Sequence, residues 1–492
     1  LLTILINLII MLLLVSHTRV FFMSIRVAPY TSYHELAKKN DNSRIWLEGE
    51  PLLRAGYEPG GFFRVSFNMD NLTVRLQFIP DSAEARKLHK EKQVRKVSGR
   101  KMKGWVKPIV DICNADVTKL FGDFCRFRAQ AFANGVIEFG VHPEELSRIQ
   151  RECEFKTNLE KGELRKGDAF LGIGISSAGI TEGFNRIGVR TKQVWAVEME
   201  ARYLDVACQN APEVYRNAHL FAGKVEEIEK DLLEPVDAFS FSMPCTNHSL
   251  QGKAKKALST AEDGDEVTAL FGVVEMIKAA NPALLFSENV PAAKDSVTYK
   301  LLIKELTRLG YTCKEMILDQ KHSGALDRRT RYWFVAYSNG LALGDIEVAE
   351  QDMVFANFGE IMESEEAYTG SWHDIEKLKR REAINKEKGR GFSMSLLTPE
   401  SSVINTLPRN ITKHQVSNPV VPSSDLTSYR LPTVNEHADM KLVPRRLVGH
   451  ASATTAHEGL GQGIAFLHAV GLAEATLSKA MGKHSEQLAL SL

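Results

Sequence analysis

DAFLGIGISSAGITEGF, residues Asp168–Phe184, is the stretch that decides the fold of this chain. An apolar run ends there in Gly172-Ile173-Gly174, and a helical pattern begins soon afterwards. Glycines at the end of a strand let the backbone turn tightly and approach a ligand. The next apolar run ends in Glu198, and a carboxylate at such a strand end can accept both hydroxyls of a ribose. The segment therefore predicts a nucleoside-binding site, which a dinucleotide or S-adenosylmethionine would satisfy equally well.

The sequence around this segment alternates between apolar runs and helical patterns from Lys166 to Ser338. Glu266–Ala280 and Ser296–Leu309 are helical stretches within it. Alternation of this kind predicts an α/β fold, with a doubly wound, mostly parallel sheet covered by helices on both faces. The runs expected to form strands are DAFLGIG, QVWAVEM, DAFSFSM, ALLFSENV, CKEMILD and YWFVAYS.

Two of these runs end in residue types that can carry chemistry. Pro244 and Cys245 follow DAFSFSM, at the edge where open α/β sheets bind ligands. A thiol there can act as a nucleophile if its pKa is lowered, although an incidental cysteine is the plainer interpretation. Glu288 and Asn289 end the next run, where a carboxyl and an amide suit acid–base work and positioning.

Two arginines precede the last apolar run. Arg329 and Arg331 lie in the segment ALDRRTRYWFVA. Their alternate spacing predicts that both side chains lie on one face of the strand. They are either part of the same site or a pair of surface arginines.

In this order, the segments resemble the DNA cytosine-5 methyltransferase family, in a form more typical of phage and prophage enzymes than of mammalian ones. The resemblance covers roughly Lys166 to the C-terminus. Besides the glycine turn and its acid, it rests on Pro-Cys, Glu-Asn-Val and Arg-x-Arg, and on two later segments. These are RLPTVNEHADMKLVP, Arg430–Pro444, and GQGI, Gly461–Ile464.

The resemblance implies a mechanism. The target cytosine is flipped out of the duplex, because its ring carbons cannot be reached in the stack. The Cys245 thiolate attacks carbon 6, and Glu288 stabilises protonation at ring nitrogen 3. Carbon 5 then takes the methyl group and loses its proton, and the cysteine leaves by elimination. Asn289 would hold the loop and Glu288 in place, and Arg329 and Arg331 would bind the base oxygen or nearby phosphates.

The resemblance also implies S-adenosyl-L-methionine as the cofactor and duplex DNA as the partner. The sequence leaves the oligomeric state open, and a monomer on DNA is expected. No metal site and no membrane partner are expected. Four features depart from the family pattern. Ile175 replaces a usual glycine and is expected to narrow the cofactor loop, and Asp327 stands where glutamine is common. Thr246 follows Pro-Cys where many relatives have glutamine, and FAGKVEEIE, Phe221–Glu229, lacks the usual aspartate. The residues expected to bind the cofactor are Phe170, Gly172, Gly174, Glu198, Met199, Pro244 and Gln462.

The pattern divides the chain into five segments. Residues 1–22 begin with an almost purely apolar run, Leu1–Val15, which is shorter than a bilayer span. They are expected to be an upstream extension not made in the cell, with a membrane anchor as the alternative. Residues 23–153 read as a β-rich accessory module and 165–340 as the catalytic domain. Residues 341–429 are expected to form a loop-rich target-recognition domain, and 430–485 to return to the catalytic domain.

The accessory module has a repetitive pattern of short strands. RIWLEG, FFRVSF and LTVRLQF are followed by WVKPIVDI, FCRFRAQAF and GVIEFGV, which suggests a duplication. Residues 40–80 weakly resemble small swapped-hairpin DNA-binding folds of the AbrB and SymE type. Between the halves lies a basic run from Arg86 to Lys103, interpreted either as a solvated linker or as a phosphate-contacting patch.

The composition, with 44% hydrophobic and 25% charged residues, is ordinary for a soluble globular protein. The formal net charge of +1 does not by itself point to nucleic acid. Six scattered cysteines without a CxxC pair fit a reducing compartment and predict a cytoplasmic protein.

Three other functions remain open from the sequence. A transfer-RNA cytosine-5 methyltransferase would use the same chemistry, but such relatives lack a large recognition domain. A catalytically silent DNA-binding regulator would leave Cys245, Glu288 and Arg329 without a purpose. A nicotinamide-dependent oxidoreductase would explain the glycine turn and nothing else.

Overall fold

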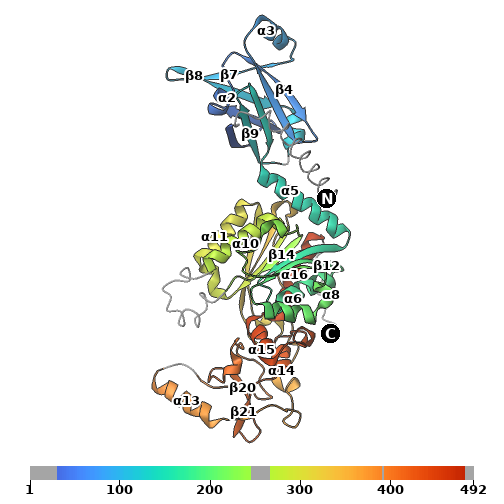
Figure 1. Cartoon of the computed structure of the whole chain (residues 1–492), viewed down its shortest axis with the longest axis vertical. Helices are drawn as coiled ribbons and strands as arrows, with labels where there is room; N and C mark the ends of the chain where they lie inside the picture. The colour runs from blue at the N-terminus through green and yellow to red at the C-terminus, as the bar shows by residue number, and fades with distance from the viewer. Residues whose placement is uncertain (1–29, 123, 245–265, 390–392, 483–492) are drawn as a thin grey trace, which may run out of the picture. The chain divides into compact units, whose positions relative to one another are not determined.

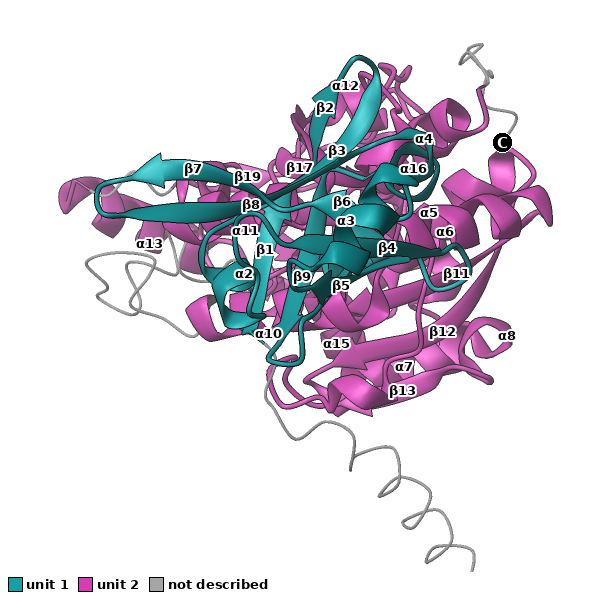
Figure 2. Cartoon of the chain, turned by 90° about the horizontal axis from the view of Figure 1, so that it is seen from above, with its two compact units in different colours: residues 1–147 teal, residues 148–492 magenta. Residues whose placement is uncertain are grey.

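The computed structural model describes residues 30–122, 124–244, 266–389 and 393–482 (Figure 1). The chain forms two compact units, residues 1–147 and 148–492, and the boundary between them falls inside helix α5 (Pro143–Glu160) (Figure 2). The apolar segment 1–22 and the expected nucleophile Cys245 lie outside the described residues.

The second unit is built on a seven-stranded sheet with the order β13-β12-β11-β14-β15-β17-β16. Neighbouring strands are parallel except where β17 lies antiparallel between β15 and β16. The first strand in sequence, β11, lies inside the sheet, so the strand order reverses between β11 and β14. The doubly wound, mostly parallel α/β fold is confirmed. The strands are β11 (Glu163–Ala169), β12 (Arg190–Glu198), β13 (His219–Ala222), β14 (Ala238–Phe241), β15 (Leu284–Asn289), β16 (Tyr311–Leu318) and β17 (Arg331–Ser338).

Five of the six apolar runs form strands of this sheet, whereas only Asp168 and Ala169 of DAFLGIG lie in β11, and the sequence pattern missed strand β13. It has four residues and lies at the edge of the sheet, paired with β12 alone. Its side chains are half-buried or exposed, so it carries no apolar run that would reveal it.

Helices cover both faces of the sheet, each over its own apolar cluster. Side chains of a strand alternate between faces, and Leu284 and Phe286 of β15 lie in one cluster while Leu285 lies in the other. The first cluster is covered by α6 (Ile175–Arg186) and α16 (Phe466–Ala480), the second by α10 (Glu266–Ala280) and α11 (Val297–Arg308) (Figure 1). The predicted helices at Glu266–Ala280 and Ser296–Leu309 are thereby confirmed.

The C-terminal segment returns to the catalytic sheet through α16, which packs closely on α6. A Cβ atom at Gly183 would lie 2.4 Å from the carbonyl oxygen of Val470, so only glycine permits this approach. Two helices form this return, because α15 (Ala453–Gln462) ends before Gly463 and α16 starts at Phe466. No single helix in the described ranges meets the length and hydropathy of a membrane span; α15 and α16, bent by 48°, do so only as a pair.

Residues 341–429 form a small, mostly irregular region. A four-stranded sheet with the order β18-β21-β20-β19 and the charged helix α13 (Glu376–Glu387) are its regular elements. One of its apolar clusters contains Leu326, which precedes β17, and Met440 of helix α14 (Val434–Met440). This region is therefore anchored to both segments that flank it in the chain. Its strands are β18 (His373–Asp374), β19 (Ser395–Leu396), β20 (Pro419–Pro422) and β21 (Ser428–Arg430).

The first unit contains a six-stranded sheet, β1-β9-β10-β5-β4-β6, and a four-stranded sheet, β2-β3-β8-β7. Its elements repeat in the order strand, helix, strand, strand, first as β3-α2-β4-β5 and then as β8-α4-β9-β10. Equivalent strands pair with each other, β3 with β8 and β5 with β10, as expected for a duplicated module. The bounds are β1 (Tyr30–Glu35), β2 (Ala37–Lys39), β3 (Asn42–Glu48), α2 (Glu50–Arg54), β4 (Phe62–Asn68), β5 (Thr73–Ile79), α3 (Ala83–Lys90), β6 (Arg95–Lys96), β7 (Ser98–Met102), β8 (Trp105–Cys113), α4 (Ala115–Phe121), β9 (Arg126–Phe132) and β10 (Val136–Val141).

Candidate active site

The glycine turn lies where β11 ends and α6 begins, at the point where the strand order reverses. Phe170, Gly172 and Gly174 all have positive φ, at 55°, 57° and 85°. Apart from Gly172 itself and its two chain neighbours, no described atom lies within 4 Å of a Cβ built on Gly172, so the turn opens onto free space. The backbone N–H of Gly172 donates to Glu198 Oε2 at 2.7 Å, and the other oxygen of Glu198 accepts from Glu200 N at 2.9 Å.

This geometry fits the nucleoside part of a cofactor. Glu198 is buried at the tip of β12, next to the open turn, and still has lone pairs for hydroxyl donors. Met199 follows it and is 56% exposed, so a flat apolar group could cover it. Phe170 holds a left-handed backbone although it is not glycine, and such strain is often kept at ligand sites.

Ile175 does not narrow the turn, so that expectation is wrong. It is the first residue of α6, and its side chain is buried in the apolar cluster beneath the helix. A Cβ on Gly463 would lie 2.7 Å from Ile175 Cδ1. The Ile175 side chain points toward the C-terminal segment, because the first residue of α6 faces the apolar cluster that α6 shares with that segment.

A buried polar network lies beneath the glycine turn. Asp168 of β11 accepts hydrogen bonds from Ser177 Oγ of α6, at 2.8 Å, and from Ser240 Oγ of β14. Lys166 lies 3.2 Å from the same carboxylate and donates to Ser177 Oγ at 2.5 Å. Burial lowers the pKa of Lys166, and the charge of Asp168 opposes that shift. The network ties the cofactor turn to the strand that leads to Pro244, and sequence reasoning missed it.

The carboxyl ends of β14 and β15 bring the expected acid and its neighbours together. Glu288 Oε1 lies 2.6 Å from Arg331 Nε, and both side chains are largely buried. The amide nitrogen of Asn289 donates to the carbonyl oxygen of Met243 at 2.9 Å and to Tyr299 Oη at 2.8 Å. Asn289 therefore holds the backbone two residues before Cys245.

The two arginines do not lie on one face, and that expectation is wrong. Arg331 faces Glu288, whereas Arg329 is buried and donates through Nη2 to the carbonyl oxygens of Gly461 (2.8 Å) and Gln462 (3.2 Å). Strand β17 begins only at Arg331, so the alternation of a strand does not extend back to Arg329. Those carbonyls lie at the C-terminal end of helix α15. The last carbonyl groups of a helix have no N–H partner within it, and Arg329 supplies hydrogen-bond donors to them.

Asp327 is fully buried, and its charge affects the pKa of the neighbouring Lys441. Its charge raises the pKa of Lys441, against the stronger effects of burial and of Arg329, which lower it. Lys441 donates to the carbonyl oxygens of Leu460 and, at 2.8 Å, Gly463. An acid in place of the usual glutamine therefore accompanies a buried lysine that holds the C-terminal segment.

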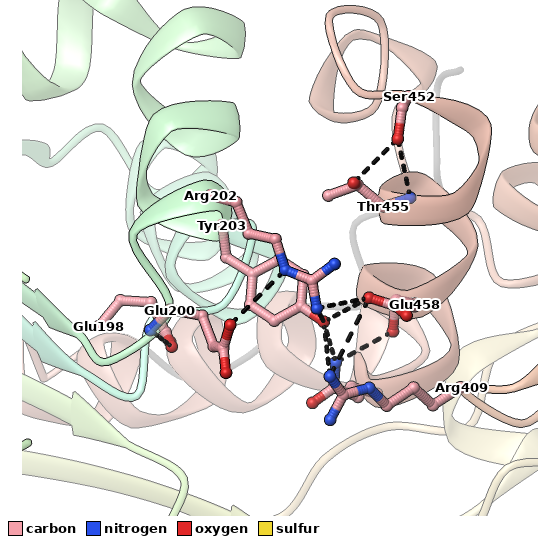
Figure 3. Close-up of polar contacts among 9 residues, drawn as sticks. Glu198, Glu200, Arg202, Tyr203, Arg409, Ser452, Thr455 and Glu458 are labelled. Atoms are coloured by element: carbon pink, nitrogen blue, oxygen red, sulfur yellow. Dashed lines mark hydrogen bonds and ion pairs between the residues drawn. The ribbon is translucent and has the colours of Figure 1, made fainter.

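A cluster around Tyr203 joins the helix that follows strand β12 to helix α15 (Figure 3). Tyr203 lies in helix α7 (Ala201–Asn210), just after Glu198, and its hydroxyl donates to Glu458 Oε2 at 2.9 Å. Gln462 Nε2 and Arg409 Nη2 each donate to that hydroxyl at 3.1 Å. Sequence reasoning named Gln462 and missed Tyr203 and Glu458, whose only signal was their place beside the expected motifs. The amide nitrogen of Gln462 is thus hydrogen-bonded to Tyr203, within the protein.

The segment RLPTVNEHADMKLVP contains the most buried ion pair that the described residues form. Arg430 and Glu436 are joined by two hydrogen bonds of 2.7 and 2.8 Å, and both side chains are almost fully buried. Thr433 caps helix α14 and donates its backbone N–H to Glu436 at 2.7 Å. Glu436 also accepts from the backbone N–H of Glu363, in the small region 341–429.

We expect Glu436→Gln to lower the free energy of unfolding by about 3 kcal/mol, because breaking a buried pair leaves Arg430 charged and unpaired. The estimate is at the lower end for such changes because glutamine keeps a carbonyl that can accept from Thr433. Chemical denaturation of the full chain measures the loss. Glu376→Gln is the matched control, since its pair with Lys379 is half-exposed and is expected to contribute less than about 1 kcal/mol. Equal effects of the two changes would contradict the prediction.

Fold and site together fit the nucleoside part of a cofactor such as S-adenosylmethionine, at the end of a doubly wound sheet. The chain belongs to the family described as C-5 cytosine-specific DNA methylase, whose profile matches residues 164–456. It is therefore an enzyme that transfers a methyl group from S-adenosylmethionine to carbon 5 of cytosine in DNA. The expected activity and cofactor are confirmed, and the nicotinamide-dependent alternative is excluded.

Several relatives match about two thirds of the chain. Type II methyltransferase M.MspI of Moraxella sp is 25% identical over 65% of this chain and 72% of its own length. Type II methyltransferase M1.ScrFI of Lactococcus lactis subsp. cremoris is 23% identical over 66% of this chain and 82% of its own. Among solved structures, a putative DNA modification methyltransferase encoded within a prophage of E. coli is 16% identical, covers 65% of this chain and 100% of its own, and has a TM-score of 0.47.

Proposed function

We propose that Cys245 is the nucleophile of this methyltransferase and that Glu288 is the group that activates the target cytosine. The observation that carries the proposal is the arrangement at the ends of β14 and β15. Glu288 is held by Arg331 at 2.6 Å, next to Asn289, which holds the carbonyl of Met243 at 2.9 Å. A carboxyl and the segment leading to a cysteine are thus kept together at the edge where such sheets bind ligands.

The reaction follows from these groups. The Cys245 thiolate forms a bond to carbon 6 of the flipped-out cytosine, and the electron pair of the 5,6 double bond moves toward the ring nitrogen. Glu288 holds a proton at ring nitrogen 3, so that carbon 5 becomes nucleophilic. S-adenosylmethionine supplies the methyl group that carbon 5 takes. Loss of the proton on carbon 5 then restores the double bond and expels the thiolate.

Cofactor binding is assigned to the open turn and its flanks. Gly172 and Gly174 allow the cofactor to approach the backbone closely, and Glu198 accepts hydrogen bonds from the ribose hydroxyls. Phe170, Met199 and Pro244 provide apolar surface around them. Gln462, whose amide donates to Tyr203, acts as a positioning residue that keeps α15 against α7.

Asn289 and Arg329 are likewise positioning residues rather than substrate contacts. Asn289 is 2% exposed and Arg329 is 3% exposed, and both side chains donate hydrogen bonds to neighbouring groups of the protein. Arg331 acts by orienting Glu288. This assignment replaces the expected contact of both arginines with the base or its phosphates.

We assign residues 165–340 and 430–485 to the catalytic domain, and 341–429 to recognition of a short DNA site. The burial of Leu326 and Met440 in the core of the small region supports a fixed position beside the catalytic sheet. Residues 23–153 form the accessory module.

By analogy with the Type II relatives, the enzyme modifies sites that a restriction enzyme would otherwise cut. It acts in the cytoplasm, as a monomer on duplex DNA.

The test is transfer of labelled methyl groups from S-adenosylmethionine by the protein starting at Met23. Unmethylated duplex DNA and transfer RNA are offered in parallel. Label recovered in DNA as 5-methylcytosine is the expected result, and sequencing the product gives the recognition site. Label in transfer RNA alone would overturn the assignment of the substrate, and no label in either would overturn the assignment of the nucleophile and acid.

A further inference from the structure

A two-stranded ribbon extends from the first unit (Figure 2). It consists of β7 and the first residues of β8, joined by a turn at Lys103–Gly104, and we name residues 98–107 the basic hairpin. The register joins Arg100 to Lys107 and Met102 to Trp105. Strand β8 pairs with β3 only from Ile109 onward. The outer part of the ribbon therefore has no third strand beside it among the described residues.

The basic hairpin belongs to a strongly basic part of the sequence. Residues 86–107 contain ten lysines and arginines and a single acid, Glu91. In the hairpin, Arg100 and Lys107 pair with Glu48, at 3.4 and 2.7 Å. Lys101 and Lys103 are exposed and form no ion pair with any described residue. These two charges are available to a partner.

The tip of the hairpin also exposes large apolar side chains. Met102 and Trp105 are each 45% exposed and lie opposite each other on one face of the ribbon. Val106, on the other face and opposite Lys101, is 43% exposed. Such a cluster next to unpaired lysines is unfavourable in water and is typical of a surface that a partner covers.

We propose that the basic hairpin is a second DNA-binding element of this enzyme. A two-stranded ribbon fits the major groove of duplex DNA, where lysines can reach the phosphates on either side. The apolar tip can contact thymine methyl groups in that groove. The choice of DNA as the partner rests on the established substrate and on the charge of the hairpin. The contact adds affinity outside the catalytic unit and takes no part in the methyl transfer itself.

The test compares two lysine pairs in the full chain. Lys101→Gln with Lys103→Gln should weaken binding to unmethylated duplex DNA roughly tenfold or more at 50 mM salt. The slope of log affinity against log salt concentration should fall in magnitude by about 1.8, because each lost phosphate contact removes about 0.9. Lys38→Gln with Lys39→Gln is the matched control, since it removes two exposed lysines from β2, at the opposite edge of the same sheet. It should leave both quantities unchanged.

A third variant separates the apolar contact from the charges. Trp105→Ser should weaken binding several-fold without changing the salt slope, because it removes no phosphate contact. At saturating DNA, all three variants should transfer methyl groups at the wild-type rate. Equal effects of the two lysine pairs, or wild-type binding by Lys101→Gln with Lys103→Gln, would overturn the proposal even if the enzyme methylates DNA. A protein that binds through the hairpin but methylates no duplex would instead contradict the assigned catalytic residues.

Discussion

Cys245→Ser is expected to lower the rate of methyl transfer to DNA by about 10⁴-fold or more. A cysteine thiol is partly ionised near neutral pH and is an intrinsically strong nucleophile, whereas a serine hydroxyl stays protonated. Because the sulfur must form the bond to carbon 6, no other group can replace it in that step. Single-turnover transfer of labelled methyl groups to duplex DNA measures the loss.

The control for this change is the same substitution at an exposed cysteine. Cys153→Ser in helix α5 removes a thiol with no expected role and should retain the wild-type rate. Cys245→Ser should also keep its affinity for DNA and for S-adenosylmethionine, because the change replaces one sulfur by an oxygen and alters no other part of the side chain. If Cys245→Ser retained a tenth of the wild-type rate, the covalent mechanism proposed for this chain would be wrong.

The sequence predicted the catalytic sheet well because its central strands are buried on both faces. Such strands read as continuous apolar runs, and Leu284–Asn289 is buried at every position. Strand β13 was missed for the opposite reason, since an edge strand of four half-exposed residues has no such signal. The residues at the strand ends were found because the reversal of strand order concentrates polar groups there.

The contacts among those residues were less predictable. The alternation of a strand suggested one face for Arg329 and Arg331, but the strand begins only at Arg331. The network around Asp168 and the cluster around Tyr203 join residues far apart in sequence, and no local pattern carries such pairings. Sequence motifs therefore indicated the candidate site residues, while tertiary contacts decide which of their side chains are bonded to the protein itself.

Glu288→Gln is expected to lower kcat by about 10³-fold and to leave KM for DNA nearly unchanged. Glutamine has almost the same shape but carries no charge, so it cannot stabilise a proton on ring nitrogen 3. The base would still enter the site, because the volume and the hydrogen-bonding reach of the side chain are retained. Steady-state methyl transfer at varied DNA concentration separates the two parameters. Glu315→Gln, which alters an exposed acid on β16 that accepts from Tyr332 at 2.6 Å, is the matched control and should retain kcat.

The same kinetic assay, applied to a double variant, decides the role of Arg331. If Arg331 acts only by orienting Glu288, then Arg331→Gln should slow the wild-type enzyme but have little further effect on Glu288→Gln. Fully additive losses in the double variant would instead mean that Arg331 contacts the base or its phosphate independently. The 2.6 Å ion pair and the near-complete burial of both side chains favour the first outcome, because the guanidinium already faces the carboxylate. Equal kcat in Glu288→Gln and wild type would remove the carboxylate from the mechanism altogether.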